Sequence, residues 1–481
     1  MAFFHGIRTS ERETSIKSPA STTAGLPVIY GTAPVHLASD PAASNKPVLC
    51  YTYAEAVAAF GYCTDWKNYT LCEAIYSEFA LYSVAPVVFV NVLDPAKHKA
   101  TVSNAETAVK DKVATVADPV LLSTLVVKAA ADGTVLKAGT DYEAAYDDDG
   151  VLQITALDGG AMASVSTVYL SYDKLDPSAV TSDDIIGGIG SDGSKKGLET
   201  LDQVFTLYRL VPGMILAPGW SDNPEVASVM KAKAGNIDGV FSAISLVDIP
   251  TDSVTTYTNA PAWKTNNNYT SADQYVGWPM VKNGSKIYHM STHLCGVCGQ
   301  TDAADDDDVP WRSPSNKELQ ATGLCLADGT DVVLDLTQAN YLNGQGITTG
   351  LNFIGGWKLW GNRTAAYPSN TDVKDAFITS RRMMHWYAQR FILTYWANVD
   401  DIINKRFIET IVDSSNIDLN GLTAGGKLLG GRMAFEAEFN PTTSLLDGSV
   451  TFHTYLGIGV PAEDIHDINE IDPSYLSGLF E

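Results

Sequence analysis

Short apolar runs bounded by turn residues dominate the first hundred positions of the chain. Residues 27–33 and 86–92 are largely apolar and rich in β-branched side chains, the pattern of strands buried on both faces. Between them, residues 53–60 and 70–82 predict two short helices. Strand, helix and strand in this order predict a parallel α/β sheet.

A different pattern occupies residues 98–179. The apolar stretches there are short and lie between turn signals, at residues 125–127, 141–146, 151–154 and 168–172. The run Asp147-Asp148-Asp149-Gly150 is typical of a hairpin turn between two of them. We therefore expect a small all-β domain inserted into the α/β core.

The α/β pattern resumes after residue 180. The expected elements alternate between helix and strand, at residues 198–208, 213–219, 224 onward and 239–244. Asn223 before Pro224, with Glu225 in the first turn, is a helix-start signal. The core domain is thus predicted to be split, with residues 21–97 rejoining residues 180–350.

Residues 351–460 form one strongly patterned stretch, which predicts an α+β domain. A strand is expected at Trp357–Gly361, after a pair of glycines. Apolar residues at helical spacing predict helices, and alternating residues predict strands, at 373–395, 399–412, 432–439 and 450–460.

Two polar segments flank these domains and are predicted to be extended arms. The first comprises residues 1–20, in which Ile7 and Ile16 are the aliphatic anchors. The second comprises residues 461–481 and is acidic, with Ile465, Ile468 and Ile471 as its apolar points.

Length and charge narrow the class of protein. The chain has 481 residues, enough for three or four domains, and 45% of them are hydrophobic. Its net charge of -24 argues against nucleic acid or an anionic membrane as a partner. No signal peptide and no apolar run of membrane-spanning length is visible, so we expect the six cysteines to be free thiols in a cytoplasm.

Two glycine-rich motifs formally match nucleotide-binding loops. Residues 188–193 fit the dinucleotide fingerprint, but the segment before them is too short and acidic for the strand that the motif needs. Residues 421–428 approach a phosphate loop, but Leu428 replaces the Ser or Thr that would bind magnesium. Both are predicted to be linkers or turns.

The strongest candidate for chemistry is Cys295-Gly296-Val297-Cys298, with His289 and His293 upstream. Two His and two Cys could in principle coordinate zinc, and the two thiols could form a redox pair. However, on a helix the two histidines share a face that Cys295 does not, which favours a tightly packed helix. No serine-hydrolase triad motif is visible. We therefore expect no enzyme, no cofactor and no metal.

Three short motifs carry a resemblance to a known family. Trp360-Gly361-Asn362-Arg363-Thr364 resembles the Trp-Gly-x-Arg-Thr segment that opens the C-terminal domain of contractile tail sheath proteins. Before it, Leu342-Asn343 with Gly346-Ile347 resembles the family's turn. The run Gly296-Val297, Asp302, Trp311, Pro314 and Asn316 resembles a further family pattern, and three ordered matches are more specific than any one of them.

The resemblance implies both a fold and a function. The fold would be a subtilisin-like-class sheet with helices, interrupted by an outer, variable insertion. The function would be that of a structural subunit that stacks as rings, with six subunits each, around an inner tube and contracts to drive the tube through a cell envelope. Its partners would be copies of itself, the tail tube protein, and baseplate and tail terminator proteins. It would be assembled in the bacterial host cytoplasm and reside in a virion tail or a tail-like particle such as a bacteriocin.

The resemblance also implies candidate contact residues. Residues 357–432 contain ten basic and seven acidic residues, a net charge of +3 within an acidic chain. Because the family's C-terminal domain contacts the tube partly through charge, Arg381, Arg382 and Arg390 are expected to face it, with ordinary surface ion pairing as the alternative. The isoleucines of the two arms are expected to link subunits by strand addition.

Two other classes of protein stay open at this point. One is a metal- or thiol-dependent enzyme that uses Cys295 and Cys298. The other is a static surface protein that forms a flat or closed lattice without a tube.

Overall fold

A computed structural model describes residues 25–304 and 309–480. Its centre is a six-stranded sheet whose strands follow the order β14-β13-β12-β1-β3-β2. Neighbouring strands are parallel except for β2, which runs antiparallel to β3 at one edge. In chain order the strands are β1 (Pro27–Gly31), β2 (Val48–Cys50), β3 (Val87–Asn91), β12 (Met214–Leu216), β13 (Ile244–Asp248) and β14 (Gln274–Gly277).

The strands of this sheet form where the sequence is apolar on both faces. Every residue of β1, β3 and β13 is buried, so both faces of the sheet are covered, as parallel sheets require. Helix α2 contacts β1, α5 contacts β12 and β13, and α7 lies against β12, β13 and β14. These helices are α2 (Thr70–Ile75), α5 (Pro224–Ala234) and α7 (Met290–Asp302).

Most local predictions for this part are confirmed. Helix α1 spans Tyr53–Phe60 as expected, and α2 continues into a π-helical turn at Tyr76–Leu81. Asn223 caps α5 by accepting a hydrogen bond from the backbone N–H of Glu225. The strand expected at residues 239–244 is wrong in position. Asp238 and Gly239 both have positive φ and form a turn, so β13 begins only at Ile244.

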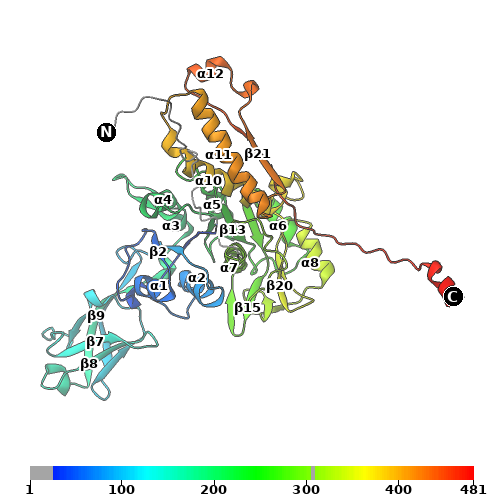
Figure 1. Cartoon of the computed structure of the whole chain (residues 1–481). Helices are drawn as coiled ribbons and strands as arrows, with labels where there is room; N and C mark the ends of the chain where they lie inside the picture. Colours follow the sequence, from blue (N-terminus) through cyan, green and yellow to red (C-terminus); the bar gives the residue numbers. More distant parts are fainter. Residues whose placement is uncertain (1–24, 305–308, 481) are drawn as a thin grey trace, which may run out of the picture.

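Residues 99–175 form two small three-stranded sheets with their own hydrophobic cluster. The sheets have the orders β4-β9-β6 and β5-β8-β7 and project from the body (Figure 1). Their strands are β4 (Lys99–Ala108), β5 (Val113–Val116), β6 (Val126–Lys128), β7 (Tyr142–Tyr146), β8 (Leu152–Ala156) and β9 (Thr167–Leu175). Lys99 at the start of β4 pairs with Leu175 at the end of β9, so the chain enters and leaves this unit at one place.

Smaller elements connect the core to the last third of the chain. One sheet has the order β16-β15-β17-β18, and β19 (Thr349–Asn352) pairs with β20 (Trp357–Trp360). The strand expected at residue 357 is therefore confirmed, with Leu359 buried. The other strands are β15 (Met280–Asn283), β16 (Lys286–Tyr288), β17 (Gly323–Cys325) and β18 (Asp331–Val332), and α8 (Leu336–Asn343) follows them.

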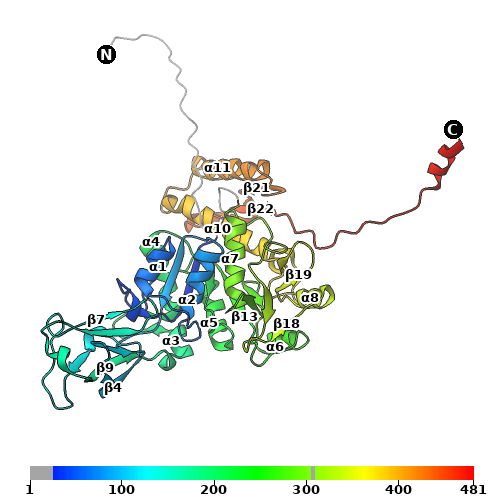
Figure 2. The same cartoon turned by 90° about the horizontal axis from the view of Figure 1, so that it is seen from below.

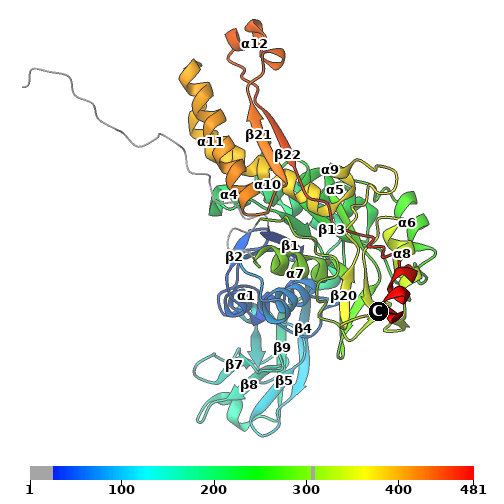
Figure 3. The same ribbon diagram turned by 45° about the vertical axis from the view of Figure 1, so that its right-hand side comes forward.

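The last third is dominated by two long helices and a β-hairpin that stands out from the body (Figure 3). Helix α10 spans Ile378–Tyr395, after the short α9 (Val373–Ala376). Helix α11 spans Lys405–Ala424, and α12 (Thr442–Leu446) lies in the loop of the hairpin β21 (Gly430–Ala434) and β22 (His453–Gly457). None of the helices in the described part of the chain is long and apolar enough to span a bilayer.

The prediction of a helix over residues 399–412 is wrong at both ends. Asn404 accepts a hydrogen bond from the N–H of Phe407 and so caps the helix, which begins at Lys405. The helix then runs on to Ala424 and includes Gly421, because its buried residues Leu419 and Leu422 pack on the hairpin side. Residues 421–428 are thus the end of a helix and its C-cap turn.

Candidate functional site

The β21–β22 hairpin is a sheet of two strands in which neither outer edge pairs with another strand of the described chain. An open edge presents backbone N–H and C=O groups that lack ladder partners, and these can pair with a strand from another chain. Of the ten residues in the two strands, only Met433 is buried. The hairpin is therefore a mostly exposed sheet of two strands to which a further strand can be added, and we call β21–β22 the unfinished hairpin.

Two asparagine side chains hold this hairpin in place, one from α11 and one from the hairpin loop. The amide of Asn416 binds both backbone groups of Met433, accepting from the N–H at 2.8 Å and donating to the carbonyl at 3.0 Å. The amide of Asn440 in the same way bridges Glu436 and Thr451 at the far end of the strands. The Asn416 contacts fix the orientation of the hairpin relative to α11 and occupy both backbone groups of Met433, whereas the Asn440 contacts tie the two ends of the hairpin loop together.

Exposed apolar side chains lie on and beside the hairpin. Leu429 precedes β21 and is 79% exposed, and Val460 follows β22 and is 53% exposed. On the hairpin itself, the Arg432 guanidinium lies 3.8 Å from the ring centroid of Tyr455, which also stacks on His453. Such exposed apolar groups beside an open edge favour contact with another polypeptide.

The C-terminal segment leaves the body as an extended chain (Figures 1 and 2). Its three predicted apolar points are among the most exposed large side chains of the molecule, with Ile465 at 88%, Ile468 at 73% and Ile471 at 94%. Isoleucines in an acidic, exposed segment gain stability only when another surface covers them. Ile7 and Ile16 lie outside the described residues.

The three arginines expected to face a tube each have a carboxylate partner within the subunit. Arg381 Nε donates to Asp273 at 2.6 Å, and Arg390 makes a two-pronged ion pair with Asp418. Arg382 is a correction to the expectation: it is 4% exposed and forms a two-pronged pair with Asp302, which is 2% exposed. In this conformation Arg382 has no surface with which to contact another chain.

A more accessible cationic and apolar surface lies between α10 and the first turn of α11, and none of its residues is among the contact residues predicted from the sequence. Trp396, Val399 and Ile402 are 63%, 63% and 81% exposed in the connection to α11. Lys405 and Arg406 are exposed at the first turn of that helix. Val399 and Ile402 fell within the helix predicted over residues 399–412, and Trp396 lay between the two predicted helices.

Cys295, Cys298 and His293 are packed inside the core, whereas His289 is partly buried. Burial raises the pKa of the Cys298 thiol to about 12 and that of Cys295 well above its usual range, so neither is a reactive thiolate. His293 is buried with its Nδ1 2.5 Å from the Tyr82 hydroxyl, and burial lowers its pKa to about 3. No group of three His, Cys, Asp or Glu residues within the described ranges is arranged to hold a metal ion.

His289 belongs to a cluster of acidic groups at the carboxyl end of the central strands. Its Nδ1 lies 2.8 Å from Glu73 Oε2, and its backbone N–H donates to the other oxygen of Glu73. Burial alone would lower the pKa of His289, but Glu73, Asp248 and Asp222 together raise it to about 9. The serines nearby donate to Asp248 rather than to the imidazole, so the arrangement is not that of a nucleophile activated by a base.

The two glycine motifs also lack the geometry of nucleotide sites. Residues Gly188–Ile189 and Lys195–Lys196 pair as a small antiparallel hairpin, not as a strand followed by a helix. Nothing in the described chain thus favours nucleotide chemistry at either place.

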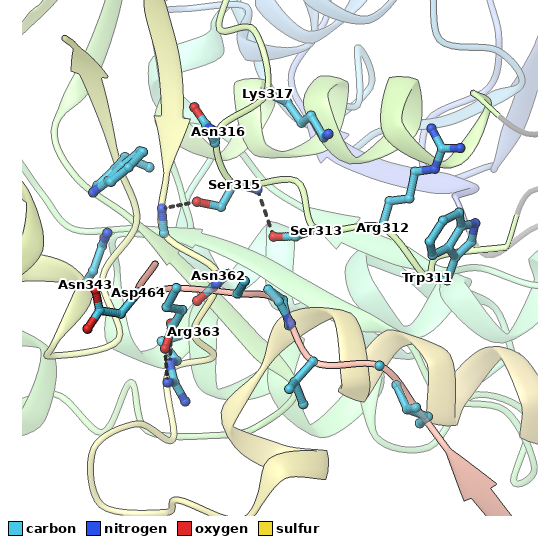
Figure 4. A pocket seen from close by; sticks show the side chains of 18 of the residues that line it. Trp311, Arg312, Ser313, Ser315, Asn316, Lys317, Asn343, Asn362, Arg363 and Asp464 are labelled. Carbon is cyan, nitrogen blue, oxygen red and sulfur yellow. Dashed lines mark hydrogen bonds and ion pairs between the residues drawn. The ribbon is translucent and has the colours of Figure 1, made fainter. Parts of the chain in front are cut away.

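A groove of about 830 Å³ lies between the β20 region and the base of the hairpin (Figure 4). Four basic residues line it, together with residues 458–464 of the chain that leaves β22. These basic residues are Arg312, Lys317, Arg363 and Lys427. The groove is therefore occupied in part by the subunit's own C-terminal segment.

Comparison with known proteins identifies relatives of the whole chain. No family model matches. The tail sheath protein of Burkholderia phage BcepMu is 28% identical over 500 residues, covering 99% of this chain and 98% of the relative. A putative prophage major tail sheath protein of Pseudomonas aeruginosa (strain UCBPP-PA14) is 25% identical over 308 residues, or 62% of this chain and 74% of the relative.

Solved structures share the fold at lower identity. The sheath complex of the extracellular contractile injection system PVC in its contracted state matches with a TM-score of 0.59 and 13% identity, over 99% of both chains. The helical sheath of the anti-feeding prophage (AFP) in its contracted state matches with a TM-score of 0.58 and 15% identity, over 98% of this chain and 100% of that chain. These solved structures show the fold of the chain, and the full-length likeness in sequence to the phage protein supports a tail sheath family for it.

Proposed function

We propose that this chain polymerises as stacked rings around an inner tube and that contraction of the lattice drives the tube through a cell envelope. The observation that carries the proposal is the unfinished hairpin β21–β22 next to an extended arm with exposed isoleucines. The subunit has a hairpin whose edges pair with no further strand of the described chain, and it also has an extended arm whose isoleucines are exposed to solvent. When the arm of one copy adds as a strand to the hairpin of another copy, the hairpin edge becomes paired and the isoleucines become covered.

Strand addition also suits a lattice that changes its dimensions. Backbone hydrogen bonds of an added strand hold two subunits together, and flexible arms let the subunits shift without separating. Contraction would then be driven by new contacts between subunits. The candidate linking residues are Ile7, Ile16, Ile465, Ile468 and Ile471.

The partners proposed beyond the chain itself are the tail tube protein, baseplate proteins and a tail terminator, with six subunits in each ring. For the tube, the exposed surface at residues 396–406 is a better candidate than the paired arginines, although Arg381 and Arg390 keep partial exposure. The net charge of -24 disfavours nucleic acid and membrane as partners. We propose assembly in the host cytoplasm and residence in a virion tail or tail-like particle.

The proposed domain division follows the sequence analysis. Arms at residues 1–20 and 461–481 flank a core of 21–97 and 180–350, and residues 351–460 form the C-terminal domain. Residues 98–179 are proposed as a variable unit that assembly does not require. The mostly parallel sheet with a split core supports the subtilisin-like class for the core domain.

Electron microscopy of the purified chain tests the proposal. We expect negatively stained samples to contain hollow, ring-stacked tubes at high protein concentration, and we expect a variant that lacks residues 1–20 to contain none. Circular dichroism of both forms should agree, which would show that the truncated chain is folded. Monomers alone at high concentration, or flat sheets without a lumen, would contradict the proposal.

A further inference from the structure

The C-terminal arm does not leave the subunit at the end of its last strand. After β22 ends at Gly457, residues 458–464 run through the groove as a strap (Figure 4). Within the strap, Glu463 accepts a hydrogen bond from Arg363 Nε at 2.8 Å, and Arg363 Nη2 donates to its second carboxylate oxygen. Two parallel charge-assisted bonds of this kind fix orientation as well as distance.

Arg363 is itself held rigidly from two sides. Its guanidinium lies 3.8 Å from the ring centroid of Phe377 and 4.3 Å from that of Tyr367. A backbone bridge also joins Arg363 to Phe377 at the start of α10. The side chain is 15% exposed with the strap in place, and the two rings and the backbone bridge hold its fork from the side of the body.

Beyond this ion pair the chain is open to solvent. Each residue from 464 to 476 is exposed. Asp464, the next residue, lines the same groove but has no ion pair within the described chain. The Arg363–Glu463 pair therefore marks the point at which strap becomes arm.

We propose that Arg363 is a positioning residue for assembly: it anchors the strap at Glu463 and so fixes the point and direction from which the C-terminal arm reaches a neighbouring copy of this chain. The inference rests on the proposed function only for the identity of the neighbour. The anchor itself is a property of the single subunit.

Release of the anchor would change the geometry of the link between subunits. The free arm would then begin at Gly457, and six further residues at about 3.3 Å each would add roughly 20 Å of slack. A longer and undirected tether lowers the effective concentration of the arm at its binding edge. The expected result is weaker assembly without any change in the contact that the arm finally makes.

A distance measurement on the free subunit tests the anchor directly. Spin labels at Asp328→Cys on the body and His466→Cys just beyond the anchor would be placed in a Cys63→Ser background, because the other five cysteines are buried. We expect a narrow distance distribution in the reference chain and at least a doubling of its width in Glu463→Gln. Asp464→Asn makes the same change in charge one residue away and should leave the width unchanged.

Arg363 variants complete the test. Arg363→Met should broaden the distribution as much as Glu463→Gln, and Arg363→Lys, which keeps the charge but loses the fork, should fall between. Since Arg363 packs between two rings, its variants can disturb the fold, whereas Glu463→Gln leaves that packing intact. An unchanged distribution in Glu463→Gln would overturn the proposal.

Assembly provides the second measurement. We expect the protein concentration at which tubes appear, measured by sedimentation, to rise several-fold in Glu463→Gln and to stay the same in Asp464→Asn. If the reference chain forms no tubes, the proposed function fails while the distance result still decides the anchor. If Glu463→Gln assembles at the same concentration as the reference, the proposed role of Arg363 in assembly is wrong.

Discussion

The six-stranded sheet and the β21–β22 hairpin differ in whether the subunit completes them. All residues of β1, β3 and β13 are buried, and helices from the same chain cover both faces of the sheet. The hairpin buries one of its ten residues, and neither of its edges pairs with a further strand within the described ranges. The subunit therefore completes its central sheet by itself and leaves the hairpin as an exposed sheet of two strands.

Charged pairs follow the same division. In the core, the side chains of Arg382, Asp302 and Glu73 are almost fully withdrawn from water. On α11, Lys405 and Glu409 pair at 3.5 Å with side chains that are 89% and 56% exposed. Because water screens the second kind of pair, equal changes in charge should have unequal effects in the two regions.

The largest effect is expected from Asp302→Asn. This change leaves the buried Arg382 guanidinium without its counter-charge and should lower the free energy of unfolding by about 3–5 kcal/mol. Glu409→Gln removes a carboxylate from the exposed pair on α11 and should change it by less than about 0.5 kcal/mol. Urea unfolding followed by circular dichroism measures both, and equal effects would remove the distinction between the two regions.

A medium effect is expected from pH through His289. Its pKa is about 9 in the folded protein and about 6.5 in the unfolded chain, so folding favours the protonated form. The resulting stability is fully present below pH 6.5 and is lost as pH rises through 9. The difference in pKa corresponds to about 3 kcal/mol.

Other groups require a matched variant in this measurement. The pKa of buried Lys264 is lowered to about 8, which shifts stability with pH in the opposite direction. The informative quantity is therefore the difference in unfolding free energy between the reference chain and His289→Gln at pH 6 and at pH 10. We expect this difference to shrink by about 3 kcal/mol at the higher pH; a constant difference would show that the imidazole is not charged in the fold.

The smallest effect on stability is expected in the arm. Replacing Ile465, Ile468 and Ile471 together by Ser changes only exposed side chains, so the free energy of unfolding should move by less than about 0.5 kcal/mol. Tube formation should nevertheless be lost, because the added strand no longer brings apolar side chains to its neighbour. Val333→Ser alters a side chain that is 87% exposed elsewhere and should leave both properties intact. Normal tubes from the triple variant would show that these isoleucines do not link subunits.

The sequence could predict what depends on neighbouring residues. The apolar strands β1 and β3, helix α1 and the cap at Asn223 all follow local patterns, and the structure has them at the expected places. The Trp-Gly-x-Arg-Thr motif pointed to the right family, although it did not show that Arg363 binds the strap.

Long-range partners could not be predicted. Asp302 lies 80 positions before Arg382, and Glu73 lies 216 positions before His289, so no periodicity relates the members of either pair. An arginine on an amphipathic helix was therefore taken as a surface charge, and its burial became visible only in three dimensions. The start of α11 was misplaced for a local reason, since acidic residues are common in the first turn of a helix and the chain has Asp400 and Asp401 just before the Asn404 cap.

The pairing of Lys99 with Leu175 gives residues 99–175 a single attachment point, reinforced by a hydrogen bond from the N–H of Asp176 to the carbonyl of His98 at 2.9 Å. A gene segment whose product begins and ends at the same spot can be lost, duplicated or exchanged in one recombination event, and the two cut ends need only a short turn to rejoin. Such an arrangement lets residues 99–175 change in sequence and length independently of the central sheet, whose strands keep their register.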